Sequence, residues 1–170
     1  MASYANATYV RDRVTETLLQ MMREREYQTI SISELVQEAG VSRSSFYRNF
    51  TDKDDVVRKH LKMLIRDWES AFSITPNQDF SDSLLRHFYQ NRVFYLLLYR
   101  SGLSWMLFEN IKSACGVKPE SPPILAYGAA SIAGAIFGWA DEWISRGMRE
   151  TPDELKILAE KFKSSTCESE

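Results

Sequence analysis

The spacing of apolar residues restricts the fold of this 170-residue chain more than any other feature of its sequence. Val10, Val14, Leu18 and Met21 follow one another at steps of three or four residues, which place their side chains on one face of a helix. Segments with this spacing recur along the chain, and none alternates in the way that predicts a strand. We therefore predict an all-α protein.

Capping residues, glycines and prolines bound the segments that we expect to be helical. The expected N-caps are Thr8, Ser33 and Ser42, followed by either Thr51 or Asp52. The expected helices cover residues 8–25, 33–39, 43–50, 53–72, 80–90, 93–100, 105–114, 123–146 and 152–163.

The charge of the chain limits how it could recognise a nucleic acid. The formal net charge is -2, and residues 1–59 hold nine basic and nine acidic side chains. Any binding to phosphates must therefore depend on the local placement of cations. Cys115 and Cys167 are too few for a disulfide framework and lack metal spacing, and the polar N-terminus does not read as a signal peptide. We expect a protein of the reducing cytoplasm.

An uncharged stretch at residues 121–140 is long enough to span a bilayer. Two prolines open the stretch, however, and alanine, glycine and serine make up about half of it. Small residues such as Gly134 and Gly138 recur at four-residue steps, which lets a second helix approach closely. We therefore expect this helix to pack against protein rather than to cross a membrane.

Residues 31–57 contain two short helical segments around a tight turn at Gly40, where a left-handed backbone would end the first helix. Helical spacing would bury Leu35, Val36, Ala39, Val41, Phe46 and Phe50, and would expose Arg43, Ser44, Ser45, Tyr47, Arg48 and Asn49. Arginine can pair with guanine and asparagine with adenine in the major groove. The residue types alone are equally compatible with an ordinary solvated helix face.

Residues 27–57 resemble the DNA-binding signature of the TetR (TetR/AcrR) family of bacterial regulators. The resemblance rests on the run AGVSRSSFY at residues 39–47, on Phe50 and on Lys53. It implies an N-terminal three-helix helix-turn-helix domain, residues 1–55. A long helix would join this domain to a helical domain for effector binding and dimerisation, residues 56–170.

The resemblance also assigns roles to single residues. Arg43, Ser44 and Ser45 would face base edges, Tyr47 and Lys53 would bind phosphates, and Asn49 would touch either a base or the backbone. Thr29, Ser31 and Ser33 would anchor the preceding helix to the phosphate chain, and Ser42 and Arg48 complete the expected DNA-contact set. The acidic residues Glu24, Glu26, Asp54 and Asp55 should point away from DNA.

The C-terminal two thirds are rich in aromatic residues, most of which we expect in the core. Candidate contacts to an effector are His60, His87, Tyr95, Tyr99, Arg100 and Tyr127, although a lone histidine or tyrosine on an apolar face is more often a satisfied core residue than a ligand contact. The sequence contains no spacing typical of a metal site, no phosphate-binding glycine loop and no catalytic set. We therefore expect no cofactor and no enzyme activity.

The resemblance implies a homodimer through the last two long helices, and the C-terminal residues are also similar to a subgroup that includes the regulator of dihydroxyacetone kinase operons. The expected function is that of a ligand-responsive repressor, which binds double-stranded DNA at a pseudo-palindromic operator and responds to an unknown small-molecule or protein effector. The alternative is a TetR-like interaction protein or coregulator that acts mainly through protein partners.

Overall fold

The computed structural model describes residues 2–77, 79–116 and 120–167, and these residues form helices, turns and loops without a strand. The elements are α1 (Ala2–Glu24), the short 3₁₀ helix η1 (Tyr27–Thr29), α2 (Ile32–Glu38), α3 (Arg43–Asn49), α4 (Lys53–Ile74), α5 (Phe80–Gln90), α6 (Arg92–Arg100), α7 (Trp105–Ala114), α8 (Pro123–Ser145) and α9 (Pro152–Cys167). The predicted all-α fold is confirmed.

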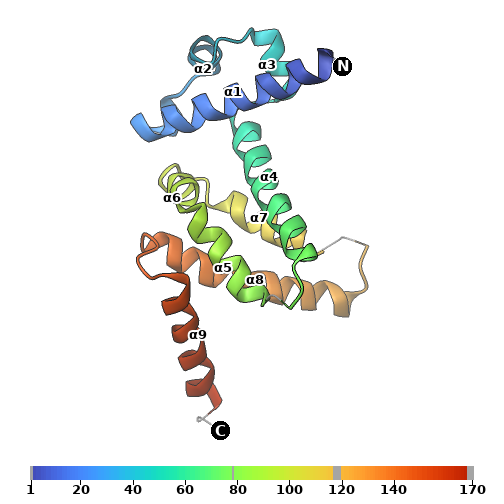
Figure 1. Cartoon of the computed structure of the whole chain (residues 1–170), viewed down its shortest axis with the longest axis vertical. Helices are drawn as coiled ribbons and strands as arrows, with labels where there is room; N and C mark the ends of the chain where they lie inside the picture. Colours follow the sequence, from blue (N-terminus) through green and yellow to red (C-terminus); the bar gives the residue numbers. More distant parts are fainter. Residues whose placement is uncertain (1, 78, 117–119, 168–170) are drawn as a thin grey trace.

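The helices form two groups that α4 connects (Figure 1). Helices α1, α2 and α3 pack against one another at one end of the molecule, and α1 also contacts the first part of α4. The second group contains α5 to α8, in which α6 and α7 both pack against α8. Helix α9 contacts α5 and extends away from the body at the opposite end (Figure 1).

The core of the first group comes from the residues that the helical spacing predicted. Val14 and Leu18 of α1 are fully buried, as are Leu35 of α2 and Phe46 of α3. Leu61 of α4 is equally buried. Burying a side chain of this size contributes roughly 1.5–3 kcal/mol, and this packing stabilises α2 and α3, which at seven residues each are too short to form alone.

Two predicted N-caps are wrong. Helix α1 begins at Ala2, so Thr8 lies inside it, because the alanines before Thr8 favour a continuous helix. Helix α2 is capped by Ser31 rather than Ser33: Ser31 and Glu34 form a capping box in which each side chain binds the other residue's backbone N–H. The caps at Ser42 and Asp52 are confirmed, as is the left-handed backbone at Gly40, where φ is 68°.

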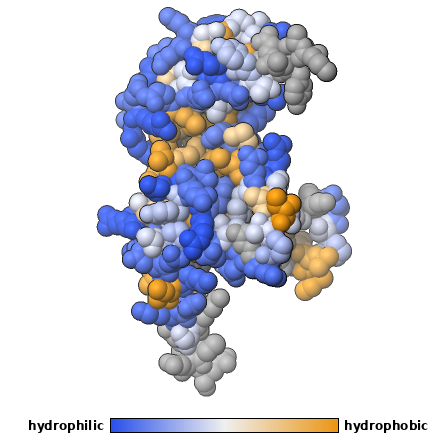
Figure 2. Space-filling model, in the orientation of Figure 1, coloured by the Kyte–Doolittle hydropathy of each residue, from blue (hydrophilic) through white to orange (hydrophobic). Residues whose placement is uncertain are grey.

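Helix α8 combines an apolar composition with high exposure. It is long and apolar enough to cross a membrane, and 11 % of the tested window is buried. Ile124 and Tyr127 are more than 70 % exposed, and Ile132 is 59 % exposed. Figure 2 shows hydrophobic surface at the right-hand side of the molecule, where α8 begins. Within this chain, α8 therefore presents an apolar face that no other described helix covers.

Candidate DNA-binding surface

Helix α3 is the second helix of the predicted helix-turn-helix, which would be its recognition helix, and its sequence fixes both of its ends. Ser42 caps the first turn by accepting a hydrogen bond from the Ser45 N–H at 3.1 Å. At the other end, the Phe50 N–H donates to the Phe46 carbonyl at 2.8 Å. Phe46 and Phe50 are both buried. One face of this two-turn helix is therefore anchored in the core and the other faces solvent.

The solvent face of α3 carries most of the residues that were predicted to contact DNA. Arg43, Ser44 and Arg48 are exposed, and Tyr47 is 57 % exposed. The hydroxyls of Ser42 and Ser45 lie 2.9 Å apart, and the Arg48 guanidinium donates to Ser45 Oγ at 3.0 Å. These side chains form one polar surface of arginine, serine and tyrosine, a chemistry suited to base edges and phosphates.

Arg43 contacts the preceding helix. Its guanidinium donates to the hydroxyl of Ser33 on α2, so the structure joins a residue predicted to face bases with one predicted to anchor the backbone. Both side chains are exposed. A hydrogen bond from a flexible arginine to a neighbouring helix reduces the number of rotamers that DNA binding must fix.

Asn49 lies at the end of α3 and has its carboxamide in use within the protein. Its Oδ1 accepts from Arg11 Nε on α1 at 3.2 Å, and its Nδ2 donates to the Ser45 carbonyl at 2.8 Å. Lys59 on α4 donates to the Asn49 carbonyl at 2.6 Å and to Asp55 at 2.8 Å. The contacts of Arg11 and Lys59 were not foreseen, because residues so distant in sequence carry no local signal of contact.

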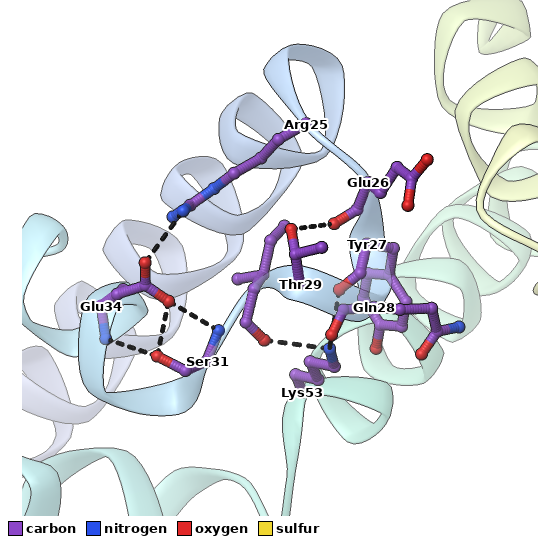
Figure 3. A network of polar contacts seen from close by, with 9 residues as sticks. Arg25, Glu26, Tyr27, Gln28, Thr29, Ser31, Glu34 and Lys53 are labelled. Carbon is purple, nitrogen blue, oxygen red and sulfur yellow. Dashed lines mark hydrogen bonds and ion pairs between the residues drawn. The ribbon is translucent and has the colours of Figure 1, made fainter.

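Thr29 and Ser31 also have intramolecular partners, as Figure 3 shows. The Thr29 hydroxyl donates to the Glu26 carbonyl at 2.8 Å, and the Ser31 hydroxyl donates to Glu34 at 2.6 Å. Glu34 is bound in addition by Arg25 at 2.9 Å. Hydrogen bonds from Ser31 and Arg25 lower the pKa of Glu34 to about 2, although this carboxylate is exposed.

Lys53, at the start of α4, points at the backbone of η1 rather than into solvent (Figure 3). Its ammonium donates to the carbonyls of Tyr27 at 2.7 Å and Ile30 at 2.9 Å, with a longer contact to the Gln28 carbonyl at 3.4 Å. The nitrogen also lies 4.3 Å from the centre of the Tyr27 ring. Desolvation lowers the pKa of Lys53.

Two of the acidic residues expected to point away from DNA bind inside the domain. Asp54 accepts a hydrogen bond from the Tyr27 hydroxyl. Asp55 is buried and accepts from the Thr51 N–H at 3.0 Å as well as from Lys59. Because each carboxylate has a donor in the protein, their negative charges are partly offset where α4 begins.

The residues predicted to contact an effector are scattered over α4, α5, α6 and α8. His87 and Tyr95 are buried and 2.8 Å apart, whereas the Tyr99 hydroxyl donates to Asp141 at 2.7 Å. The exposed Arg100 donates to the Arg23 carbonyl of α1 at 3.2 Å, and Tyr127 is 74 % exposed. His60 packs edge-on against Phe94 and lines a groove between α1, α4 and the end of α7. The structure brings together one pair of the six.

An apolar cavity of about 630 Å³ lies elsewhere, between α4, α5, the end of α7 and the first half of α8. Its lining includes Ile65, Trp68, Phe72, Phe80, Phe88, Ile111, Cys115 and Ile132. None of the six predicted effector residues lines it. The aromatic residues were assigned to the core from sequence, because their spacing does not distinguish a core from a cavity wall.

Comparisons with known proteins place the first group of helices in a family. The sequence profile of bacterial regulatory proteins of the tetR family matches residues 14–59. No curated protein sequence matches the chain. Among solved structures, the crystal structure of Lin0861 from Listeria innocua is similar over 92 % of this chain and 90 % of that chain, with a TM-score of 0.74 and 17 % sequence identity. The fold of both groups of helices is therefore shared with a solved protein.

Proposed function

We propose that this chain, whose residues 14–59 match the profile of the tetR family of bacterial regulatory proteins, is a DNA-binding homodimeric repressor that leaves a pseudo-palindromic operator when an effector binds. One observation carries the proposal. Helix α3 buries Phe46 and presents Arg43 and Tyr47 to solvent, so its polar face is free to enter a major groove.

In the proposed complex some residues of α3 contact bases and others contact phosphates. Arg43, Ser44 and Ser45 read base edges, with Ser33 orienting the Arg43 guanidinium. Tyr47 and Arg48 bind phosphates. Thr29 and Ser31 reach the phosphate chain only by exchanging their present acceptors, Glu26 and Glu34, for phosphate oxygens. Residues 1–55 would thus be the DNA-binding domain, and residues 56–170 the effector-binding and dimerisation domain.

The dimer is proposed to form through α8 and α9. Ile132 and Trp139 of α8 and Phe162 of α9 are 40–59 % exposed. At Gly134 and Gly138 an added Cβ would meet no atom within 4 Å, so packing within the chain does not require glycine there. Glycine inside a helix costs about 1 kcal/mol relative to alanine. A partner helix lying against this surface would explain both the glycines and the apolar exposure.

The effector is proposed to bind in the apolar cavity and to be a neutral, largely apolar molecule. The cavity volume of about 630 Å³ suits a small ligand. Glu69 is the charged residue of the described lining, and no described buried side chain has an unpaired polar atom. Ile65, Trp68 and Phe72 of α4 form one wall. A ligand that moves this wall would move the helix that begins beside the recognition helix.

An interaction protein that works mainly through protein partners is the second candidate. The balanced charge of residues 1–59 favours it, because nine acidic residues oppose nine basic ones. We propose a cytoplasmic location in either case. The similarity to the subgroup with the dihydroxyacetone kinase operon regulator stays a prediction.

A gel shift with the purified protein and the DNA upstream of its own coding region tests the proposal. Binding that weakens with salt and that unrelated competitor DNA does not displace supports an operator-binding repressor. The same assay after a pull-down from cell extract tests the second candidate. Sequence-specific binding that appears only when a captured protein is added would favour the coregulator.

A further inference from the structure

The contacts of Lys53 disagree with the phosphate-binding role that the resemblance assigns to it. A lysine ammonium has three N–H donors. In this structure the nitrogen lies within hydrogen-bond distance of three backbone carbonyls, those of Tyr27, Gln28 and Ile30. Lys53 could therefore bind a phosphate only by breaking hydrogen bonds that it already makes within the protein.

The surroundings of the ammonium also favour an internal role. Lys53 is half-buried, and the Tyr27 ring lies against its charge. The Tyr27 hydroxyl is bound in turn by Asp54, the next residue along α4. Tyr27 is itself 3 % exposed and Asp54 is half-buried, so this cluster is a partly buried seam between η1 and the first turn of α4.

The two parts of the seam come from segments before and after the recognition helix: η1 precedes α3 in the sequence, and α4 follows it. Element η1 leads directly into α2, whose start is fixed by the capping box of Ser31 and Glu34. Helix α3 comes next, and α4 follows it after Phe50, Thr51 and Asp52. Tying η1 to α4 therefore limits how far α2 and α4 can move apart, and with them the orientation of the recognition helix between them.

We propose that Lys53 is a positioning residue for operator recognition, which sets the orientation of α3 by joining η1 to α4 and makes no contact with phosphate. This inference rests on the proposed DNA reading by α3. It differs from that proposal in what it requires of Lys53, because a positioning residue and a phosphate contact have different consequences for salt dependence and for non-specific binding.

Physical arguments separate the two roles. A residue that neutralises one phosphate contributes about 0.9 to the slope of log K against log salt and supports binding to any DNA sequence. A residue that orients the recognition helix contributes nothing to that slope. Its loss weakens binding to the operator, where base contacts must align, and leaves the non-specific affinity unchanged.

The experiment is a set of fluorescence anisotropy titrations across a series of KCl concentrations, with an operator fragment obtained by binding-site selection and a scrambled fragment. The variant Lys53→Met removes the ammonium and keeps the length of the side chain. Lys62→Met serves as the matched control, because Lys62 is an exposed lysine farther along α4. Far-UV circular dichroism verifies that each variant is folded.

We expect Lys53→Met to lose about tenfold in operator affinity, with unchanged salt slope and unchanged affinity for the scrambled fragment. Lys62→Met should match the wild type in operator affinity, in salt slope and in affinity for the scrambled fragment. A slope that flattens by about one, with both DNAs bound more weakly, would overturn the positioning role and establish a phosphate contact. Unchanged operator affinity would overturn it as well.

A second variant keeps the test decisive if Lys53→Met fails to fold. Tyr27→Phe removes the hydrogen bond to Asp54 and alters no charge, so it should lower operator affinity in the same selective manner. Hydrogen exchange of the free protein is the DNA-independent readout: the Ile30 amide, which donates to the Tyr27 carbonyl, should exchange faster in either variant. Unchanged exchange would contradict the seam, whereas a wild type that binds no DNA would refute the proposed function itself.

Discussion

Arg11 of α1 donates from Nε to the Oδ1 of Asn49, the last residue of α3, over 3.2 Å. The same asparagine donates to the Ser45 carbonyl, and its own carbonyl accepts from Lys59 of α4. One residue thus joins α1, α3 and α4. A side chain with both ends of its carboxamide in use is better suited to fixing a helix than to reading a base.

Arg11→Met and Asn49→Ala should therefore weaken operator binding through the same interaction. Each change should reduce the affinity by about three- to tenfold, the effect of losing one hydrogen bond at the joint. The double variant should be no weaker than the weaker single variant, because the second change removes nothing further. Anisotropy titrations of the wild type, the two single variants and the double variant form a double-mutant cycle. Additive losses, with a changed preference at one base pair for Asn49→Ala, would show a direct base contact.

Arg43→Ala should relax the base preference at one position of each half-site. A bidentate arginine–guanine pair discriminates by about 1–3 kcal/mol, and this is lost when the guanidinium is removed. Binding-site selection with the variant measures the change directly. Arg66→Ala, at an exposed position farther along α4, is the control and should select the wild-type sequence. An Arg43 variant that selects that sequence equally well would place base reading elsewhere.

Sequence reasoning succeeded where one local pattern determines one local structure. The buried spacing of Val14 and Leu18, the cap at Ser42 and the left-handed Gly40 were all predicted. It failed at α2, where the Ser31–Glu34 capping box was present in the sequence but Ser33 was chosen. Thr8 was misread because a good capping residue does not interrupt a helix that its neighbours favour.

Contacts between distant residues could not be predicted in the same way. The resemblance gave Lys53 a role in phosphate binding, and the structure directs its ammonium to carbonyls some twenty-five residues earlier. The effector candidates were chosen for polar tips, yet the cavity is lined by side chains such as Trp68 and Phe72. Which apolar side chains leave a gap depends on how helices pack, and no periodicity within one helix contains that information.

Gly138→Leu tests the dimer surface. An added Cβ at this position would meet no atom of its own chain within 4 Å, so the folded monomer should retain its stability. It would occupy the space proposed for the partner helix and should make the protein monomeric in sedimentation experiments. Operator affinity should then fall by on the order of 100-fold, because two linked half-site contacts become independent. Ala71→Leu, at an exposed position of α4, is the matched control. A dimeric Gly138→Leu protein would contradict the assigned surface.

The apolar cavity should prefer uncharged ligands. Medium-chain fatty alcohols should raise the unfolding temperature and weaken operator binding, whereas the corresponding carboxylates should do neither, because the described part of the lining offers them no cation. A ligand at one hundred times its Kd stabilises the folded state by about 2.7 kcal/mol. Gly128→Phe, which fills part of the cavity from α8, should abolish both effects. Equal responses to alcohols and carboxylates would refute the proposed ligand class.

His87 should make folding stability depend on pH. Burial lowers the pKa of its imidazole to about 4, so the unfolded chain, with a pKa of about 6.5, binds a proton more readily. Stability is then complete above the unfolded pKa and falls as the pH drops toward 4. Urea unfolding should give a free energy of unfolding roughly 2 kcal/mol lower at pH 5 than at pH 7 from this residue. His87→Gln should lack that difference, and an unchanged pH dependence would contradict the assignment.

Binding-site selection with the wild-type protein and random DNA tests the central claim most directly. A dimer that inserts two α3 helices into successive major grooves should enrich a pseudo-palindrome with half-site centres about one helical turn apart. Enrichment of such a sequence, lost at elevated salt, is the predicted result. Sequences without any shared motif after repeated rounds would contradict operator reading by the recognition helix and would favour a regulator that reaches DNA through another protein.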